Sequence, residues 1–194
     1  MFKKSLLLAS ICTSLALPAI ASDLSYTYIG VSYETGEVAD LDFDGFGIQG
    51  SVALNDSFFL LGDYTSLGSD DEFDIGFGSD DIDAEQLVLG VGFHTPVSNI
   101  VDFVAILAYA EAEVKTRGLK EDGNGYLVSA GVRSKPTDKL EFAAFINYSD
   151  IENESETGYA LGARYFVLPP ASLGLGYESA DDVDVFVFDI RFDF

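Results

Sequence analysis

The stretch DLDFDGFGIQG begins at Asp40 and carries three aspartates at alternate positions, followed by a glycine. Asp40, Asp42 and Asp44, with the glycine that follows, have the spacing of the first positions of an EF-hand calcium loop. The twelfth residue of such a loop must be a bidentate glutamate, and here it is Ser51. We therefore predict that these aspartates belong to the polar end of a β-strand and form no dedicated metal site.

The single histidine limits the acid–base chemistry that the chain can perform. Hydrolysis and acyl transfer commonly use a histidine held beside an acid or a serine. His94 precedes Thr95 and Pro96 at a predicted turn and has no acid next to it in the sequence. Carboxylates are abundant, but their spacing singles out no catalytic pair. We expect a structural histidine, no cofactor and no enzymatic activity.

A more specific set of charges occupies alternate positions in several segments, on the same face as small residues. Opposite charges that are enclosed together should pair, because burial of a lone charge is costly. We predict a network that plugs an enclosed interior; the alternative is a constriction that selects ions by charge. The members of this set are Arg133, Arg164, Arg191, Asp63, Glu141, Asp189 and Asp193.

Strands must position these charges, because apolar residues recur with period two in segment after segment. The alternation is clearest in 140–148, 159–167 and 186–194. Segments of roughly 24–33, 58–67 and 100–114 are less regular, with apolar residues on both faces. We count ten strands, with eight as the alternative.

The connections alternate between two kinds. Four are short and rich in turn residues, at 55–57, 95–98, 135–138 and 168–171. The other five are longer and acidic. Short turns at one end and long polar loops at the other are typical of a transmembrane antiparallel up-and-down β-barrel of the outer-membrane kind.

The N-terminus has the three parts of a secretory signal peptide. Lys3 and Lys4 form a basic start, residues 5–17 are apolar, and Ala19-Ile20-Ala21 is a small-x-small cleavage site. A membrane anchor is less favoured, because Pro18 ends an apolar run that is already short. We expect residues 1–21 to be removed and residues 22–194 to form the barrel domain.

Charge and hydropathy together point to a protein whose polar and apolar surfaces are segregated. The chain has 33 acidic and 10 basic residues, with a net charge of −23, yet it is 48% hydrophobic and has a mean hydropathy of +0.21. Nucleic-acid binding is disfavoured, because phosphate contacts need basic side chains. The only cysteine, Cys12, lies in the predicted signal peptide, so no disulfide or thiolate metal site is expected.

The face opposite the apolar one distinguishes a membrane barrel from a soluble barrel. It is small, rich in glycine and almost free of lysine, whereas a soluble barrel would show lysine and glutamate on its outside. Small residues suit the interior of a narrow barrel. We predict that the apolar face meets lipid and that Phe59, Phe145 and Phe166 fill a closed or very narrow lumen.

The C-terminal strand ends in alternating large apolar residues: Phe186, Phe188, Ile190, Phe192 and Phe194. This pattern resembles the insertion signal of Gram-negative outer-membrane proteins. The chain is similar to small porin-like, opacity-type barrels of proteobacteria. More narrowly, DLDFDGFGIQGSVALNDSFFLLGDYTS and LVLGVGFHTPVSNIVDFVAILAY resemble the diffusible-signal-factor-regulated outer-membrane family. The resemblance implies a cell-envelope location and recognition by the outer-membrane assembly machinery.

These observations favour a non-enzymatic surface or envelope-structural protein that acts through acidic extracellular loops. The alternative is a narrow, cation-preferring, porin-like channel. Outer-membrane lipid and lipopolysaccharide are the expected partners, and divalent cations could bridge the acidic loops to lipopolysaccharide phosphates. A solvated, repulsive outer surface is the simpler explanation of the same acidic residues.

Overall fold

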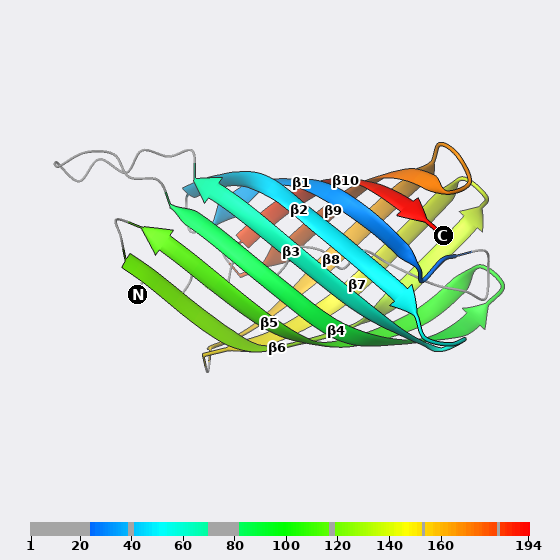
Figure 1. Ribbon diagram of the computed structural model, residues 1–194. Helices are drawn as coiled ribbons and strands as arrows, with labels where there is room; N and C mark the ends of the chain where they lie inside the picture. The colour runs from blue at the N-terminus through cyan, green and yellow to red at the C-terminus, as the bar shows by residue number, and fades with distance from the viewer. Residues whose placement is uncertain (1–23, 39–40, 70–81, 117–118, 153, 182) are drawn as a thin grey trace.

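The computed structural model describes residues 24–38, 41–69, 82–116, 119–152, 154–181 and 183–194, which form a closed β-barrel (Figure 1). Each strand pairs antiparallel with the next one along the chain, and β1 also pairs with β10. The prediction of a ten-stranded up-and-down barrel is confirmed, and the eight-stranded alternative is wrong. The strands are β1 (Tyr28–Val38), β2 (Leu41–Ala53), β3 (Phe58–Ser69), β4 (Asp83–Ser98), β5 (Val101–Thr116), β6 (Leu119–Thr137), β7 (Leu140–Ile151), β8 (Glu154–Phe166), β9 (Ala171–Ala180) and β10 (Val183–Asp193).

The barrel has two different ends. The short connections 54–57, 99–100, 138–139 and 167–170 all lie at one end, which we call the turn end. An even strand number brings the start of β1 and the end of β10 to this same end, where the Phe194 amide donates a hydrogen bond to the Thr27 carbonyl (3.0 Å). The opposite end is the loop end. Only two residues separate the strands of β1–β2, β5–β6, β7–β8 and β9–β10 there, and only the β3–β4 connection, 70–82, is long. The prediction of five long loops is therefore wrong for four of them, because the paired strands continue into the acidic segments.

The outer surface of the barrel is a broad apolar band. Alternation in β10 places buried residues inside and exposed phenylalanines outside, so that Phe188 is 50% exposed and the terminal Phe194 71%. Phe46 on β2 is 70% exposed for the same reason. A continuous apolar surface of this extent is suited to lipid and unsuited to water. A closed sheet also pairs its backbone groups around the ring, which hydrocarbon requires.

Outward tyrosines mark the boundary of this band toward the loop end. Several of their rings lie next to one another, such as Tyr126 and Tyr148 (centroids 6.2 Å apart) and Tyr159 and Tyr177 (6.1 Å). Aromatic side chains of this kind favour the interface between lipid and water. Within the described residues, there is no helix with the length and apolar character needed to cross a membrane.

The lumen is more aliphatic than the glycine-rich face predicted from the sequence. Two buried clusters fill much of it, one containing Phe59, Val104 and Phe145 and the other Phe43 and Val185. This explains why the segments that became β3 and β5 have apolar residues on both faces: one face meets lipid, and the other packs inside the lumen.

The first strand begins later than predicted, at Tyr28 instead of Leu24. Strand pairing stops there because both partner strands end: the Ala53 amide of β2 donates to the Thr27 side chain (3.2 Å), and β10 finishes beside the Thr27 carbonyl. The preceding residues are irregular, and Ser25 exchanges hydrogen bonds with Thr27. Leu24 and Tyr26 nevertheless point into the lumen, where they are 1% and 3% exposed.

Candidate functional site

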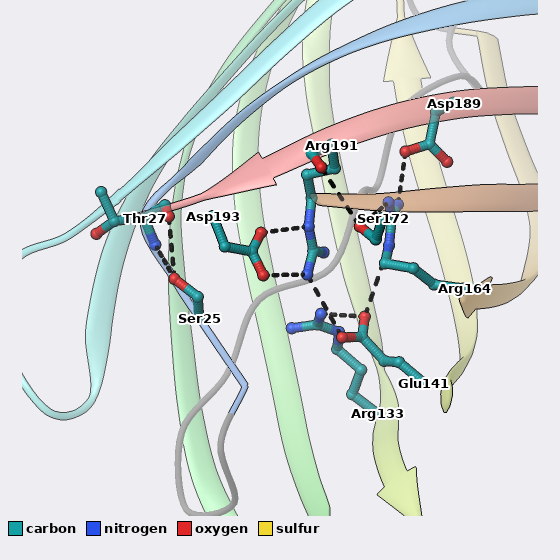
Figure 2. A network of polar contacts seen from close by, with 9 residues as sticks. All are labelled: Ser25, Thr27, Arg133, Glu141, Arg164, Ser172, Asp189, Arg191 and Asp193. Atoms are coloured by element: carbon teal, nitrogen blue, oxygen red, sulfur yellow. Dashed lines mark hydrogen bonds and ion pairs between the residues drawn. The ribbon is translucent and has the colours of Figure 1, made fainter. Parts of the chain in front are cut away.

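A network of buried charges lies inside the barrel near its turn end (Figure 2). Strand register assembles it, because inward positions of neighbouring strands fall side by side. Glu141 on β7 is opposite Arg164 on β8, which is opposite Gly174 on β9, which in turn is opposite Asp189 on β10. Six of the seven charges predicted from the sequence meet here: Arg133, Glu141, Arg164, Asp189, Arg191 and Asp193.

Glu141 is the centre of the network, because its carboxylate contacts all three arginines. Arg133 donates a hydrogen bond to Oε1, and Arg164 Nε lies 4.0 Å from the same oxygen. Arg191 Nη2 lies 3.4 Å from Oε2. Glu141 is 1% exposed, and Arg133 and Arg191 have no exposed surface. The contact between Arg191 and Glu141 joins β10 to β7, so it crosses part of the lumen instead of following one hairpin.

Two of the arginines, Arg164 and Arg191, each contact a second carboxylate in addition to Glu141. Arg164 Nη2 lies 2.7 Å from Asp189 Oδ1, and its Nη1 donates to the Ser172 hydroxyl (3.2 Å). Arg191 donates through Nε and Nη2 to the two oxygens of Asp193 (2.7 and 3.1 Å). Its guanidinium also lies over the Tyr28 ring, 4.9 Å from the centroid. These contacts enclose three cations with three anions in a site shielded from water, where an unpaired charge would be costly. The buried Asp102 lies next to this set, opposite Arg133 on the neighbouring strand.

Asp63 is inward and 4% exposed, but the structure places it in a different group. Thr65 donates to Asp63 Oδ1 (3.3 Å) and lies 3.4 Å from Glu34 Oε1, which also accepts from Ser32 (2.9 Å). Sequence reasoning missed Glu34 and the equally buried Glu178. Their position in the alternation of β1 and β9 was the available signal, since they lie on the same face as the glycines of these strands.

A small cavity of about 60 Å³ borders the network. Its polar lining comprises Gln49 and Glu178 together with three network residues, Glu141, Arg164 and Asp189. The volume is enough for a few water molecules, which polar walls of this kind can hold. A cavity of this volume is too small to be a wide channel through the part of the barrel that holds the network.

His94 lies at the turn end, as predicted, but it does have an acidic neighbour. Its Nδ1 is 3.3 Å from Asp102 Oδ2, and both side chains are essentially buried. The hairpin of β4 and β5 brings them together, because Pro96 is opposite Asp102. Asp102 is not adjacent to His94 in the sequence, so only the register of the predicted hairpin could have indicated this pair.

The loop end carries a second, exposed ion cluster on the outer face of β4, β5 and β6. Lys115 lies 2.9 Å from Glu85 and 3.1 Å from Glu113, and Lys120 lies 2.5 Å from Glu113. Glu113 is two outward positions beyond Tyr109 on β5, so this cluster lies outside the apolar band. Hydrogen bonds from Lys120 and Lys115 lower the pKa of Glu113, and a hydrogen bond to Glu85 raises the pKa of Lys115.

The aspartates of the DLDFDGFGIQG stretch lie in strand and not in a calcium loop. Asp42 and Asp44 are within β2, which pairs with both β1 and β3. Asp40 and the acidic stretch 70–81 lie outside the described residues. Among the residues that are described, no group of three or more His, Cys, Asp or Glu side chains is arranged to hold a metal ion.

The apolar outer band, the closed sheet and the enclosed charges define a class, the outer-membrane β-barrel proteins. The chain belongs to the outer membrane protein beta-barrel domain family, whose model matches residues 5–165. No curated protein sequence matches it significantly.

Solved structures of similar shape have very different sequences. The KdgM porin in complex with disordered oligogalacturonate is 9% identical, with a TM-score of 0.51, and the match covers 86% of this chain and 99% of that one. Neisserial surface protein A is 16% identical (TM-score 0.42; 88% and 98% covered). Ail of Yersinia pestis, in complex with sucrose octasulfate, is also 16% identical (TM-score 0.39; 85% and 95% covered). At such identities the likeness concerns the fold alone.

Proposed function

We propose that this barrel is a non-enzymatic, non-conducting envelope protein that acts at the cell surface through its acidic loop end. The observation that carries the proposal is the contact between Arg191 and Glu141. It reaches from β10 to β7 inside the barrel, and the buried Arg133 and Arg164 contact the same carboxylate. Such a cluster supports a lumen that is filled at the turn end and leaves interaction with the surroundings to the loop end.

Planar-bilayer recording tests the closed lumen directly. The purified barrel, confirmed as folded by a mobility shift between unboiled and boiled samples on SDS gels, is reconstituted in a bilayer at 1 M KCl. We expect no discrete current steps. Reproducible steps from protein that is fully folded would overturn the proposal, and heat-denatured protein from the same preparation is the control.

The second candidate function is a narrow, cation-preferring channel. The inward carboxylates of Glu34, Asp63 and Glu178 favour it, because they lie beyond the charge-balanced network and add negative charge to the lumen. If steps are seen, their reversal potential in a KCl gradient distinguishes this candidate. A cation-selective potential that weakens in Glu34→Gln would support the channel.

The partners follow from the two ends of the barrel. At the loop end, we propose that divalent cations bridge acidic residues to lipopolysaccharide phosphates; calcium should then increase lipopolysaccharide binding, and EDTA should reverse it. The described basic residues there, Lys115 and Lys120, are already paired with glutamates.

At the turn end, the outward Phe194 supports recognition by the assembly machinery. Phe194→Ser should slow the appearance of the heat-modifiable form in cells.

Two finer assignments complete the proposal. Residues 1–21 are a signal peptide, so N-terminal sequencing of the outer-membrane form should begin at Ser22. The narrower resemblance to the diffusible-signal-factor-regulated family would place this barrel in a proteobacterial envelope whose composition responds to a signal. Expression measured with and without that signal tests the assignment.

A further inference from the structure

The cavity that borders the charge network lies between two facing walls of the lumen. One wall is made of small residues that lie directly opposite one another on β7, β8 and β9, namely Ala143, Gly162 and Gly176. Gln49 on β2 lines the cavity from the other wall. A Cβ on Gly176 would have only one close neighbour, Val187 Cβ at 3.3 Å, so these small residues leave space in front of the strands.

Gln49 presents a buried hydrogen-bond acceptor to this space. Its side chain is 4% exposed, and its Oε1 has no hydrogen-bond partner among the described residues. The inward positions beside it offer no donor, because Gly30 on β1 has no side chain and Asp63 on β3 carries a carboxylate. Since a buried carbonyl without a partner is costly, we expect the cavity to hold a hydrogen-bond donor or a cation.

Charge favours the cation. Glu178, which is 5% exposed, lines the same cavity and lies opposite the apolar Val185 and Ala160. Within the described part of the barrel, buried carboxylates outnumber buried guanidinium groups, and a cation would offset part of this difference in a place shielded from water. The carboxylates are those of Glu34, Asp63, Asp102, Glu141, Glu178 and Asp189, and the guanidinium groups are those of Arg133, Arg164 and Arg191.

The size and the ligands of the cavity favour a monovalent ion. Calcium takes about six to eight oxygen ligands, several of them from carboxylates. Glu141 and Asp189 are held by arginines, and no described group of three acidic side chains is arranged to hold a metal ion. A volume of about 60 Å³ has room for one sodium or potassium ion that keeps some of its water.

We propose that this cavity binds one partly hydrated monovalent cation, with the Gln49 carbonyl oxygen and the Glu178 carboxylate as its protein ligands. The proposal goes beyond the closed lumen, because it assigns to the lumen a bound ion that stabilises the barrel. It requires no current through the barrel.

Thermal unfolding in two chloride salts tests the site. The folded barrel, in micelles of a non-ionic detergent, is heated in sodium chloride or in N-methyl-D-glucamine chloride, and circular dichroism follows unfolding. The two salts screen charge equally at equal concentration, but only sodium is small enough for the cavity. We expect the midpoint to be about 3–6 °C higher in sodium, the shift produced by a ligand at roughly ten times its dissociation constant. Equal midpoints would overturn the proposal.

Variants locate the sodium effect. Glu178→Gln keeps the shape of the side chain and removes its charge, and Gln49→Met keeps the length and removes the oxygen. Each should lose at least half of the midpoint difference between the salts, and two variants from opposite walls keep the test valid if one fails to fold. Glu113→Gln removes a carboxylate from the exposed cluster and should keep the full difference. A full difference in both lumen variants would place the sodium at the acidic loop end and overturn the site. Current steps in a bilayer would overturn the closed lumen and leave this comparison unchanged.

Discussion

The barrel contains two ion clusters of similar composition in opposite surroundings. At the turn end, Glu141 is enclosed by three guanidinium groups and has almost no exposed surface. At the loop end, Glu113 is held by Lys115 and Lys120, whose side chains are 43% and 56% exposed. Each cluster joins different strands through one glutamate that more than one cation shares.

Exposure to water, more than the number of contacts, determines how much each cluster contributes to stability. Water screens the exposed charges and solvates any partner that is lost, so such pairs contribute little. Inside the lumen, loss of one partner leaves an uncompensated charge that water does not reach. The choice of cation agrees with this: arginine, which can share several fixed hydrogen bonds, is used inside, and lysine is used outside.

The largest effect is expected for Glu141→Gln, which keeps the shape of the side chain and removes the shared charge. Three buried guanidinium groups would then face only Asp102, Asp189 and Asp193. We expect the free energy of unfolding to fall by about 3–5 kcal/mol. Urea unfolding followed by far-UV circular dichroism in detergent micelles measures it, because the chain has no tryptophan. An unchanged unfolding midpoint would mean that the network is not a buried ion cluster.

A smaller loss is expected for Gly174→Ala, which disturbs the network by crowding. An added Cβ would collide with the Asp189 carboxylate and lie 3.0 Å from Arg164 Nη2, so the ion pair must shift. Overpacking of this kind costs about 1–3 kcal/mol. Gly50→Ala is the matched control in a strand, because its nearest neighbour would be the Tyr28 carbonyl oxygen at an ordinary 3.6 Å. Equal stabilities of the two variants would contradict the crowding argument.

Much of the barrel could be predicted from local pattern. Period-two alternation gave the ten strands and the outward set on β10, because alternate residues of a strand face opposite sides. The start of β1 was missed, since a strand needs partners and the lengths of β2 and β10 decide where pairing stops. The aliphatic lumen behind β3 and β5 was missed because apolar residues on both faces were ambiguous without the neighbouring strands.

The site was harder to predict. The alternation along a strand shows whether a side chain faces the lumen or the outside, but not how far along the barrel axis it lies. Asp63 shares the inward face with Glu141 but lies opposite Gln49 and Val88, away from the arginines. The contact between His94 and Asp102 depends on hairpin register, which a short turn fixes only to within a residue or two. Tyr26 precedes β1, and nothing in the local pattern indicated that its ring would turn into the lumen against His94.

The smallest effect is expected for Glu113→Gln, the counterpart of Glu141→Gln in the exposed cluster. The unfolding midpoint should fall only slightly below that of the wild type, because water replaces most of the lost contacts. Since Lys120 and Lys115 hold the pKa of Glu113 below its ordinary value of about 4.3, its contribution is present above that pH and is lost as pH falls through the lowered pKa. In Glu113→Gln this part of the acid response should be absent. Raising the salt concentration should bring wild type and variant together, because exposed pairs are screened, whereas the Glu141→Gln difference should persist. If salt abolished both differences equally, the lumen network would be as open to water as the rim.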